Sequence, residues 1–290
     1  MRLHALAPAK VNLFLHVGPV AGDGYHPLAS LAVFADVGDR VTVEPADRLS
    51  LTVAGPFGQG LDGPDNLILT ALRVLGEAAG VGEPGLRVML DKQLPVAAGL
   101  GGGSSDAGAA LRLAREALAI TVDDAALSRI AAVVGADGPM CLFPQTAWAE
   151  GRGDVLTPEP RLPPLHAVLV NPGVPSPTGA VYRAYDAGPA GAADRPAPPA
   201  DWSVETVIDW LAARRNDLEA PAVALEPVIG EALGAVASTP GVALARMSGS
   251  GATVFGLCFD ADAAAMAAER LAAWRPGWWV RPCVLGRPSA

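Results

Sequence analysis

The stretch Leu94–Ala114, LPVAAGLGGGSSDAGAALRLA, places four glycines and two serines directly before an alanine-rich segment. Glycine is entropically costly to order, so this run indicates a backbone with a fixed task. Residues 85–95 before it are typical of a strand, and the spacing after Ser105 predicts a helix to about Leu118. Converging N–H groups and the positive end of a helix dipole together favour an anion, and phosphate is the natural ligand.

The glycine run differs from the two best-known phosphate-binding patterns. A Walker A loop needs a lysine after its last glycine, and no lysine follows this run. A dinucleotide fingerprint started at Gly99 has Ser104 in place of its last glycine. A flexible connector stays open as the alternative, although two serines able to cap a helix favour a structured role.

The composition indicates a globular chain with core enough for one large or two modest domains. Of 290 residues 51% are hydrophobic, and the formal net charge of -9 argues against nucleic acid as a partner. No apolar run of 18 residues occurs, so we expect no membrane span, and the first residues are not typical of a signal peptide. Three widely spaced cysteines, Cys141, Cys258 and Cys283, favour a protein with reduced thiols in the cytoplasm. The sequence does not determine the oligomeric state.

The basic residues are almost all arginine, and only Lys10 and Lys92 are lysine. Lysine offers a compact charge and a pKa that burial can tune, so a chain that prefers arginine can retain lysine where a guanidinium does not serve. Lys10 shares one face of an alternating strand, residues 9–17, with Asn12. Lys92 lies just before the glycine run, where both an approach to phosphates and a surface position are open.

Strand and helix patterns mix without strict alternation, which predicts an α+β fold. The segment from Ala184 to Trp202, rich in alanine, proline and glycine, predicts a mobile loop, and the chain divides near residue 155. We expect strands at 28–35, 39–45, 165–173 and 278–285, strand pairs at 146–158 and 242–259, and helices at 64–80, 123–134, 203–219, 223–239 and 260–274.

Seven motifs recur in one order along the chain. They are PAKVNLFLHV (8–17), DGYHPL (23–28), DNLI (65–68), GLGGGSSDA (99–107), GADGPMCLF (135–143), NDLE (216–219) and SGSGATVFG (248–256). This order resembles the GHMP kinases, in particular members whose substrate carries cytidine diphosphate. The resemblance implies an N-terminal α+β ATP-binding domain (1–155), a C-terminal ferredoxin-like α/β sandwich domain (156–290), and ATP-dependent phosphorylation of a small-molecule hydroxyl.

The resemblance assigns two catalytic residues. Asp137 matches the aspartate that accepts the proton of the substrate hydroxyl, a role that contributes about 10²–10⁴-fold. Lys10 matches the lysine that keeps this aspartate ionised and neutralises the developing alkoxide. The alternatives are a turn aspartate in Gly-Ala-Asp-Gly-Pro and a solvent-facing lysine on an edge strand.

The resemblance also assigns binding residues. Asn12 and Thr178 contact the substrate, while Tyr25 and Tyr182 stack on cytosine and His26 hydrogen-bonds its edge. ATP, bringing Mg²⁺, lies on Pro95, Val96, Ala97, Ala98, Gly99, Leu100, Gly101, Gly102, Gly103, Ser104 and Ser105, with Asn66 at the adenine. Helix capping by Asn66 is an equal alternative. The hydroxyls of Ser104 and Ser105 can bind phosphate or Mg²⁺, with Ser105 as a weak candidate for the metal. No carboxylate is clearly placed as a ligand of Mg²⁺.

The chain departs from the family pattern at three places. The family usually has glycine at Ala97 or Ala98, a bulkier residue at Gly138 and phenylalanine at Met140. We expect little harm to phosphate binding, because the later glycines are intact, and a looser placement of Asp137. Two other functions stay open: another GHMP kinase, acting on homoserine or a mevalonate, and a nucleotide-binding protein without catalysis. A dinucleotide-dependent oxidoreductase is a more distant alternative.

Overall fold

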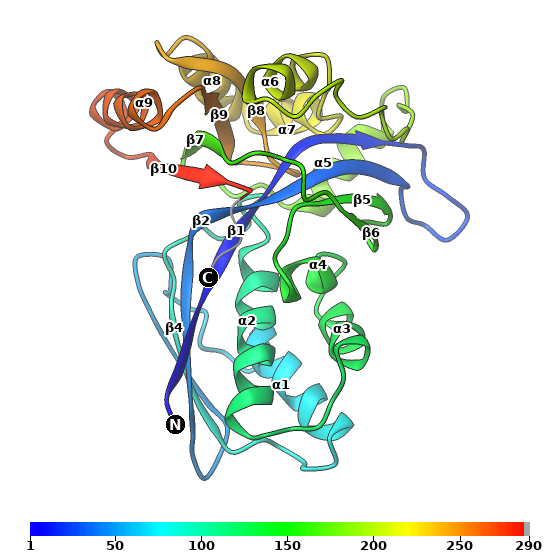
Figure 1. Cartoon of the computed structure of the whole chain (residues 1–290), viewed down its shortest axis with the longest axis vertical. Coiled ribbons are helices and arrows are strands. Elements are labelled where there is room, and N and C mark those ends of the chain that lie inside the picture. The colour runs from blue at the N-terminus through cyan, green and yellow to red at the C-terminus, as the bar shows by residue number, and fades with distance from the viewer. Residues whose placement is uncertain (287–290) are drawn as a thin grey trace.

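Two long antiparallel strands, β1 (Leu3–Val17) and β2 (Leu28–Pro45), run through both halves of the molecule in the computed structural model, which describes residues 1–286 (Figure 1). The sequence predicted two strands where β2 is one continuous strand. Gly38 allows this continuity, because a Cβ there would lie 2.2 Å from the Ala7 carbonyl oxygen of β1. The two strands therefore cross closely without a break.

The N-terminal half packs four helices against strands β2, β3 (Ser50–Ala54) and β4 (Leu86–Asp91), as Figure 1 shows. The buried side chains between them are mainly alanine, leucine and valine, which are small enough to let helices approach the sheet closely. The helices are α1 (Leu67–Ala78), α2 (Gly102–Ala117), α3 (Asp124–Val133) and the short α4 (Gly138–Leu142).

Two local predictions in this half need correction. Helix α2 begins at Gly102, three residues before the expected start, so the glycine run itself forms the first turn. The sequence left a turn at Gly-Ala-Asp-Gly-Pro open as an alternative and predicted no helix there, whereas the residues after Asp137 form α4 with Pro139 in its first turn, a position that proline tolerates. The predicted hairpin is confirmed as β5 (Ala147–Gly151) and β6 (Val155–Pro158).

The C-terminal half is a four-stranded antiparallel sheet in the order β10-β7-β9-β8. With helices between β7 and β8 and between β9 and β10, this is the β-α-β-β-α-β order of a ferredoxin-like fold, as expected. The strands are β7 (Leu165–Asn171), β8 (Val242–Met247), β9 (Val254–Cys258) and β10 (Trp279–Leu285), and the helices are α5 (Thr178–Asp186), α6 (Val204–Ala212), α7 (Glu219–Leu225), α8 (Pro227–Ala237) and α9 (Ala261–Trp274).

The segment expected to be a mobile loop is held by polar contacts. Its first residues belong to α5, and residues 187–203 form no helix or strand. His16 Nδ1 lies 2.9 Å from the Asp194 carbonyl oxygen, and Trp210 Nε1 donates to the Ala197 carbonyl at 2.8 Å. These contacts join the loop to β1 and α6, and its mobility stays a prediction.

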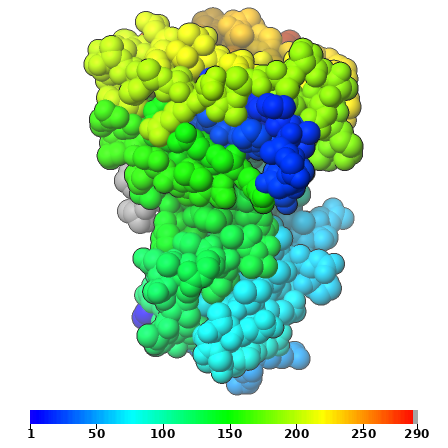
Figure 2. Space-filling view, turned by 90° about the vertical axis from the view of Figure 1, so that its right-hand side faces the viewer, coloured from blue at the N-terminus to red at the C-terminus, as the bar shows by residue number. Residues whose placement is uncertain are grey.

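The two halves share a core. Phe14 of β1, Trp148 of β5 and Trp210 of α6 meet edge to face, with ring centroids 5.8–6.2 Å apart. The predicted division at residue 155 falls at the start of β6, which pairs with β5, so the sheet continues across it. Figure 2 shows the broader C-terminal half above the narrower N-terminal half, in continuous contact. Among residues 1–286 no helix is both long and apolar enough to cross a membrane.

Candidate active site

The glycine run forms an open amide cradle at the start of α2. Gly99 and Gly101 have φ of 72° and 62°, a left-handed conformation that glycine adopts without steric cost. The Ser105 amide donates to the Gly101 carbonyl at 2.9 Å, which is the first bond of the helix. The amides of Gly102, Gly103 and Ser104 precede it and have no acceptor within the helix, so they are available to an anion.

The second glycine turn, residues 248–253, supports this cradle from the C-terminal half. A Cβ on Gly99 would lie 2.3 Å from the Ser248 carbonyl oxygen, so only glycine allows the two turns to meet. Ser248 Oγ donates to the Gly99 carbonyl at 2.9 Å, and the Thr253 amide donates to the Ala98 carbonyl at 3.1 Å. The loop is therefore fixed by both halves of the molecule.

A cavity of about 970 Å³ opens in front of the cradle. It is lined by nearly all of the residues that the sequence singled out: Lys10, Asn12, Tyr25, His26, Asn66, residues 95–104, Asp137, Thr178 and Tyr182. Ser105 is the exception. It is buried, its amide is used in the helix, and it does not line the cavity, so the structure gives no support to Ser105 as a phosphate or metal contact.

Lys10 and Asp137 form an ion pair inside this cavity, with Nζ 3.1 Å from Oδ2. The Lys10 side chain is 7% exposed, so the alternative of a solvent-facing lysine is wrong, whereas the Asp137 side chain is 39% exposed and open to a substrate. Lys10 Nζ also donates to Asn12 Oδ1 at 2.8 Å, and Asn12 Nδ2 donates to Ser30 Oγ at 2.8 Å. The ammonium is thus held by partners on its own strand and across from it.

The departure at Gly138 has a packing reason. A Cβ on Gly138 would lie 1.9 Å from the Ala131 carbonyl oxygen of α3, so α3 and α4 approach at this point only because the residue is glycine. Asp137 directly precedes this contact and keeps its ion pair with Lys10. A looser Asp137 was expected from the sequence, whereas the close α3–α4 contact holds its backbone.

The far end of the cavity is aromatic. The Tyr25 ring is half exposed and carries the Arg152 guanidinium 4.2 Å from its centroid. The rings of His26 and Tyr182 lie 5.0 Å apart. Burial, with a smaller effect of Asp137, raises the pKa of Tyr182 to about 12, so its phenol stays neutral. Stacking of a nucleobase on these rings stays a prediction. Thr178 Oγ1 lies 2.9 Å from Ser250 Oγ, so this side chain contacts the second glycine turn.

The imidazole of His26 is already engaged on both sides. Nδ1 lies 2.9 Å from the Gly18 carbonyl oxygen and Nε2 lies 3.2 Å from Asp186 Oδ1. An edge contact from this ring to cytosine, as the sequence predicted, would require exchange of one partner. Within the described residues the main-chain N–H and C=O of His26 make no hydrogen bond, so they are the free polar groups at this position.

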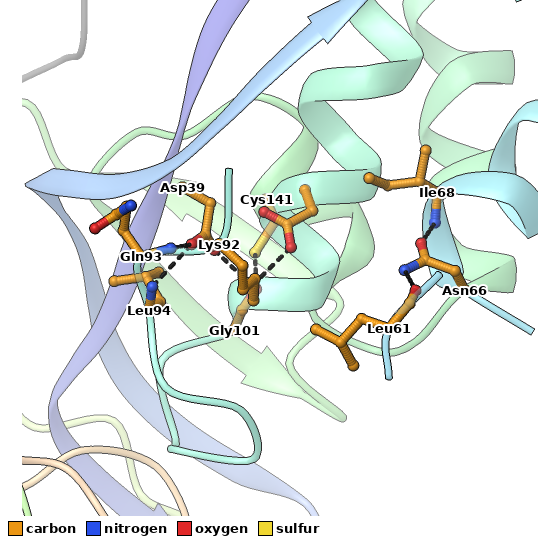
Figure 3. A network of polar contacts seen from close by, with 10 residues as sticks. Asp39, Leu61, Asn66, Ile68, Lys92, Gln93, Leu94, Gly101 and Cys141 are labelled. Carbon is orange, nitrogen blue, oxygen red and sulfur yellow. Dashed lines mark hydrogen bonds and ion pairs between the residues drawn. The ribbon is translucent and has the colours of Figure 1, made fainter. Parts of the chain in front are cut away.

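Asn66 caps helix α1, which confirms one of its two predicted roles. Its Oδ1 accepts from the Ile68 amide at 2.9 Å, and its Nδ2 donates to the Leu61 carbonyl at 2.7 Å (Figure 3). Both ends of the amide are used, although the residue borders the cavity. Contact with adenine stays a prediction.

A buried charge cluster beneath the cradle was not assigned from the sequence. Lys92 is 3% exposed, so the surface position left open for it is wrong, and its Nζ lies between Asp39 and Asp106. Burial raises the pKa of Asp106 to about 8 against the opposing effect of Lys92. The scarcity of lysine pointed to Lys92, but nothing local in the sequence pointed to Asp39 or Asp106.

Comparison with known proteins agrees with this architecture. Residues 66–145 match the model of the GHMP kinases N terminal domain, and residues 204–276 match that of the GHMP kinases C terminal. The chain therefore belongs to the GHMP kinase family. The family uses ATP, which supports ATP as the cofactor, and its place on the glycine loop stays a prediction.

Within the family, the chain groups with the 4-diphosphocytidyl-2-C-methyl-D-erythritol kinases. It is 58% identical to the kinase of that name from Caulobacter vibrioides, over 98% of this chain and 100% of the relative. The Paramagnetospirillum magneticum kinase of that name is 48% identical, over 96% and 97%. A crystal structure of 4-(cytidine 5'-diphospho)-2C-methyl-D-erythritol kinase superposes with a TM-score of 0.78 at 38% identity, covering 98% and 100%.

More distant kinases share the fold alone. A homoserine kinase from Cytophaga hutchinsonii superposes with a TM-score of 0.72 at 17% identity, covering all of this chain and 96% of that one. The expected α+β class and two-part GHMP kinase architecture are thus confirmed.

Proposed function

We propose that this chain transfers the γ-phosphoryl group of ATP to the 2-hydroxyl of 4-diphosphocytidyl-2-C-methyl-D-erythritol, giving the 2-phosphate and ADP in the non-mevalonate route to isoprenoid precursors. One observation carries the proposal: the Lys10–Asp137 pair and the free amides of the glycine loop face the same cavity. A base, a cation and a phosphate cradle in one cavity are the parts that phosphoryl transfer needs.

The reaction follows from this placement. The amides of Gly102, Gly103 and Ser104 bind the phosphates of ATP and lie at the positive end of the α2 dipole. Asp137 accepts the proton of the substrate hydroxyl as the oxygen attacks phosphorus. Lys10, 3.1 Å from Asp137, places its positive charge beside the carboxylate and neutralises charge as the alkoxide develops. Asn12 orients Lys10 through their 2.8 Å hydrogen bond.

The aromatic end of the cavity receives the cytosine. Tyr25 and Tyr182 offer rings for stacking, which contributes roughly 1–3 kcal/mol per base. The free N–H and C=O of His26 match the acceptor N3 and the donor amino group on the cytosine edge. The His26 ring, held by Gly18 and Asp186, fixes that main chain rather than contacting the base.

The residues present fit Mg²⁺ bound mainly through ATP. Mg²⁺ in kinases takes one or two carboxylates together with phosphate oxygens and waters. Within residues 1–286 no group of three His, Cys, Asp or Glu side chains is gathered for a metal, and the oxygen-bearing side chains that line the cavity include those of Asp65, Ser104, Asp106 and Asp137. When bound, the ion neutralises phosphate charge. The three cysteines are free and buried, which supports a reducing, cytoplasmic setting.

The test is turnover of the purified protein with ATP and the cytidine substrate, followed as ADP release, for the wild type and Asp137→Asn. We expect the variant to fold and bind both ligands but to lose at least about 10²-fold in kcat. Full activity of Asp137→Asn would remove this residue from the mechanism. ADP release with homoserine or mevalonate instead would assign another GHMP reaction, and ATP binding without turnover on any hydroxyl would favour a non-catalytic protein.

A further inference from the structure

The buried cluster of Lys92, Asp39 and Asp106, here called the Lys92 cluster, takes no part in the mechanism above. Lys92 Nζ lies 2.5 Å from Asp39 Oδ2 and 2.7 Å from Asp106 Oδ2. All three residues are at most 3% exposed. Figure 3 shows Lys92 and Asp39 side by side next to Gly101, at the base of α2. Burying three ionisable groups together is costly, so we looked for a function of the cluster.

The Lys92 cluster joins the two ends of the glycine loop. Asp39 Oδ1 accepts hydrogen bonds from the amides of Gln93 and Leu94, at 2.6 and 2.8 Å, where the chain enters the loop. Asp106 lies in the first turns of α2, where the chain leaves it. Lys92 connects both carboxylates, so one ammonium closes the loop that carries the free amides.

The Lys92 ammonium lies close beneath Gly102. A Cβ on Gly102 would lie 3.0 Å from Lys92 Nζ and 3.6 Å from Asp39 Oδ2. The cluster therefore fills the space directly beneath the first helical residue of the cradle. An ammonium is a compact point charge, whereas a guanidinium is a wide planar fork. The compact ammonium therefore suits this position in a chain whose basic residues are almost all arginine.

We propose that Lys92 is a positioning residue for the nucleotide: by bridging Asp39 and Asp106 it holds the amides of residues 102–104 in the arrangement that binds ATP phosphates. This inference rests on the proposed function, because it takes ATP as the occupant of the cradle. The cytidine end of the cavity lies on other elements, so the effect is confined to the nucleotide.

The test is Lys92→Arg, which keeps the charge and changes its shape. Calorimetry with a non-hydrolysable ATP analogue is expected to show a Kd raised at least about 10-fold, while the Kd of the cytidine substrate and kcat at saturating ATP stay within about 2-fold. Arg87→Lys is the matched control, since Arg87 lies on β4, the strand that leads to Lys92, and makes an exposed pair with Glu44 at 2.7 Å. It should change none of these values.

Asp106→Asn is a second test variant, which keeps the shape of the cluster. The same binding measurements on it test the proposal if Lys92→Arg fails to fold. It should weaken analogue binding in the same selective way, by a smaller factor. Unchanged analogue binding in the folded variants overturns the proposal, and so does equal loss of both ligands, which would indicate general damage. A wild type that fails to bind the analogue would instead refute the proposed function.

Discussion

Ala97 shows at the scale of one residue how this chain departs from its family. Its φ is +52°, in the left-handed region that costs a residue with a Cβ roughly 1–2 kcal/mol. The family pattern has a glycine at position 97 or 98, where this chain has alanine. The positive φ shows that position 97 is the one at which glycine is favoured. The Ser176 amide donates to the Ala97 carbonyl at 3.2 Å and helps to hold the strained residue.

Ala97→Gly is therefore expected to stabilise the protein. Relief of the left-handed strain exceeds the added entropy of glycine by about 0.5 kcal/mol, which raises Tm by about 1 °C in a chain of this length. Ala98→Gly is the control, because Ala98 has no positive φ and should lose roughly 0.5–1 kcal/mol. Thermal melts of the two variants test this. An equal decrease of Tm in both variants would show that Ala97 is not strained.

At the scale of one element, the hairpin β5–β6 is fixed by a buried carboxylate just beyond its second strand. Glu159 is 2% exposed, accepts from Trp148 Nε1 at 3.0 Å and forms a two-pronged pair with Arg161 at 2.7 Å. The Arg161 hydrogen bonds, assisted by Trp148, lower the pKa of Glu159 from 4.5 to about 2. The ionised form is thus part of the folded state.

The sign of the resulting pH dependence follows from that lowered pKa. Because the folded state holds Glu159 ionised, its contribution is complete above about pH 4.5 and is lost as the pH falls toward 2. Between pH 7 and pH 3.5 the wild type should lose on the order of 1 kcal/mol more unfolding free energy than Glu159→Gln. Urea unfolding at the two pH values measures this, and parallel losses would contradict it.

At the scale of the whole molecule, the two family domains are joined into one structure. The paired strands β1 and β2 run through both halves, and Phe14, Trp148 and Trp210 form a shared aromatic contact. The cradle belongs to the N-terminal half, yet Ser248 and Thr253 of the C-terminal half hold it in place. Neither half contains a complete site. Stability of the site therefore depends on stability of the shared core.

Leu257→Ala tests this dependence, because Leu257 of β9 is fully buried in the shared core. The cavity should cost about 2–5 kcal/mol. Hydrogen exchange should show opening free energies reduced by the same amount in β2, from the N-terminal half, and in β9. Loss of protection limited to β8, β9 and β10 would mean that the halves unfold separately.

Much of this protein was predictable from local sequence. The glycine run, the Asn66 cap, the β5–β6 hairpin and most helices depend on residues a few positions apart, and so their patterns are visible in the sequence. The family motifs added Lys10 and Asp137, which the structure brings to 3.1 Å.

Tertiary structure decided what depends on residues far apart in the chain. The continuity of β2 depends on how Gly38 meets β1, and the burial of Lys92 depends on Asp39, which is 53 residues away. The engagement of His26 likewise depends on Asp186 of α5. A buried charge is stable only beside its partner, and no spacing within one segment records a partner that the fold supplies from elsewhere.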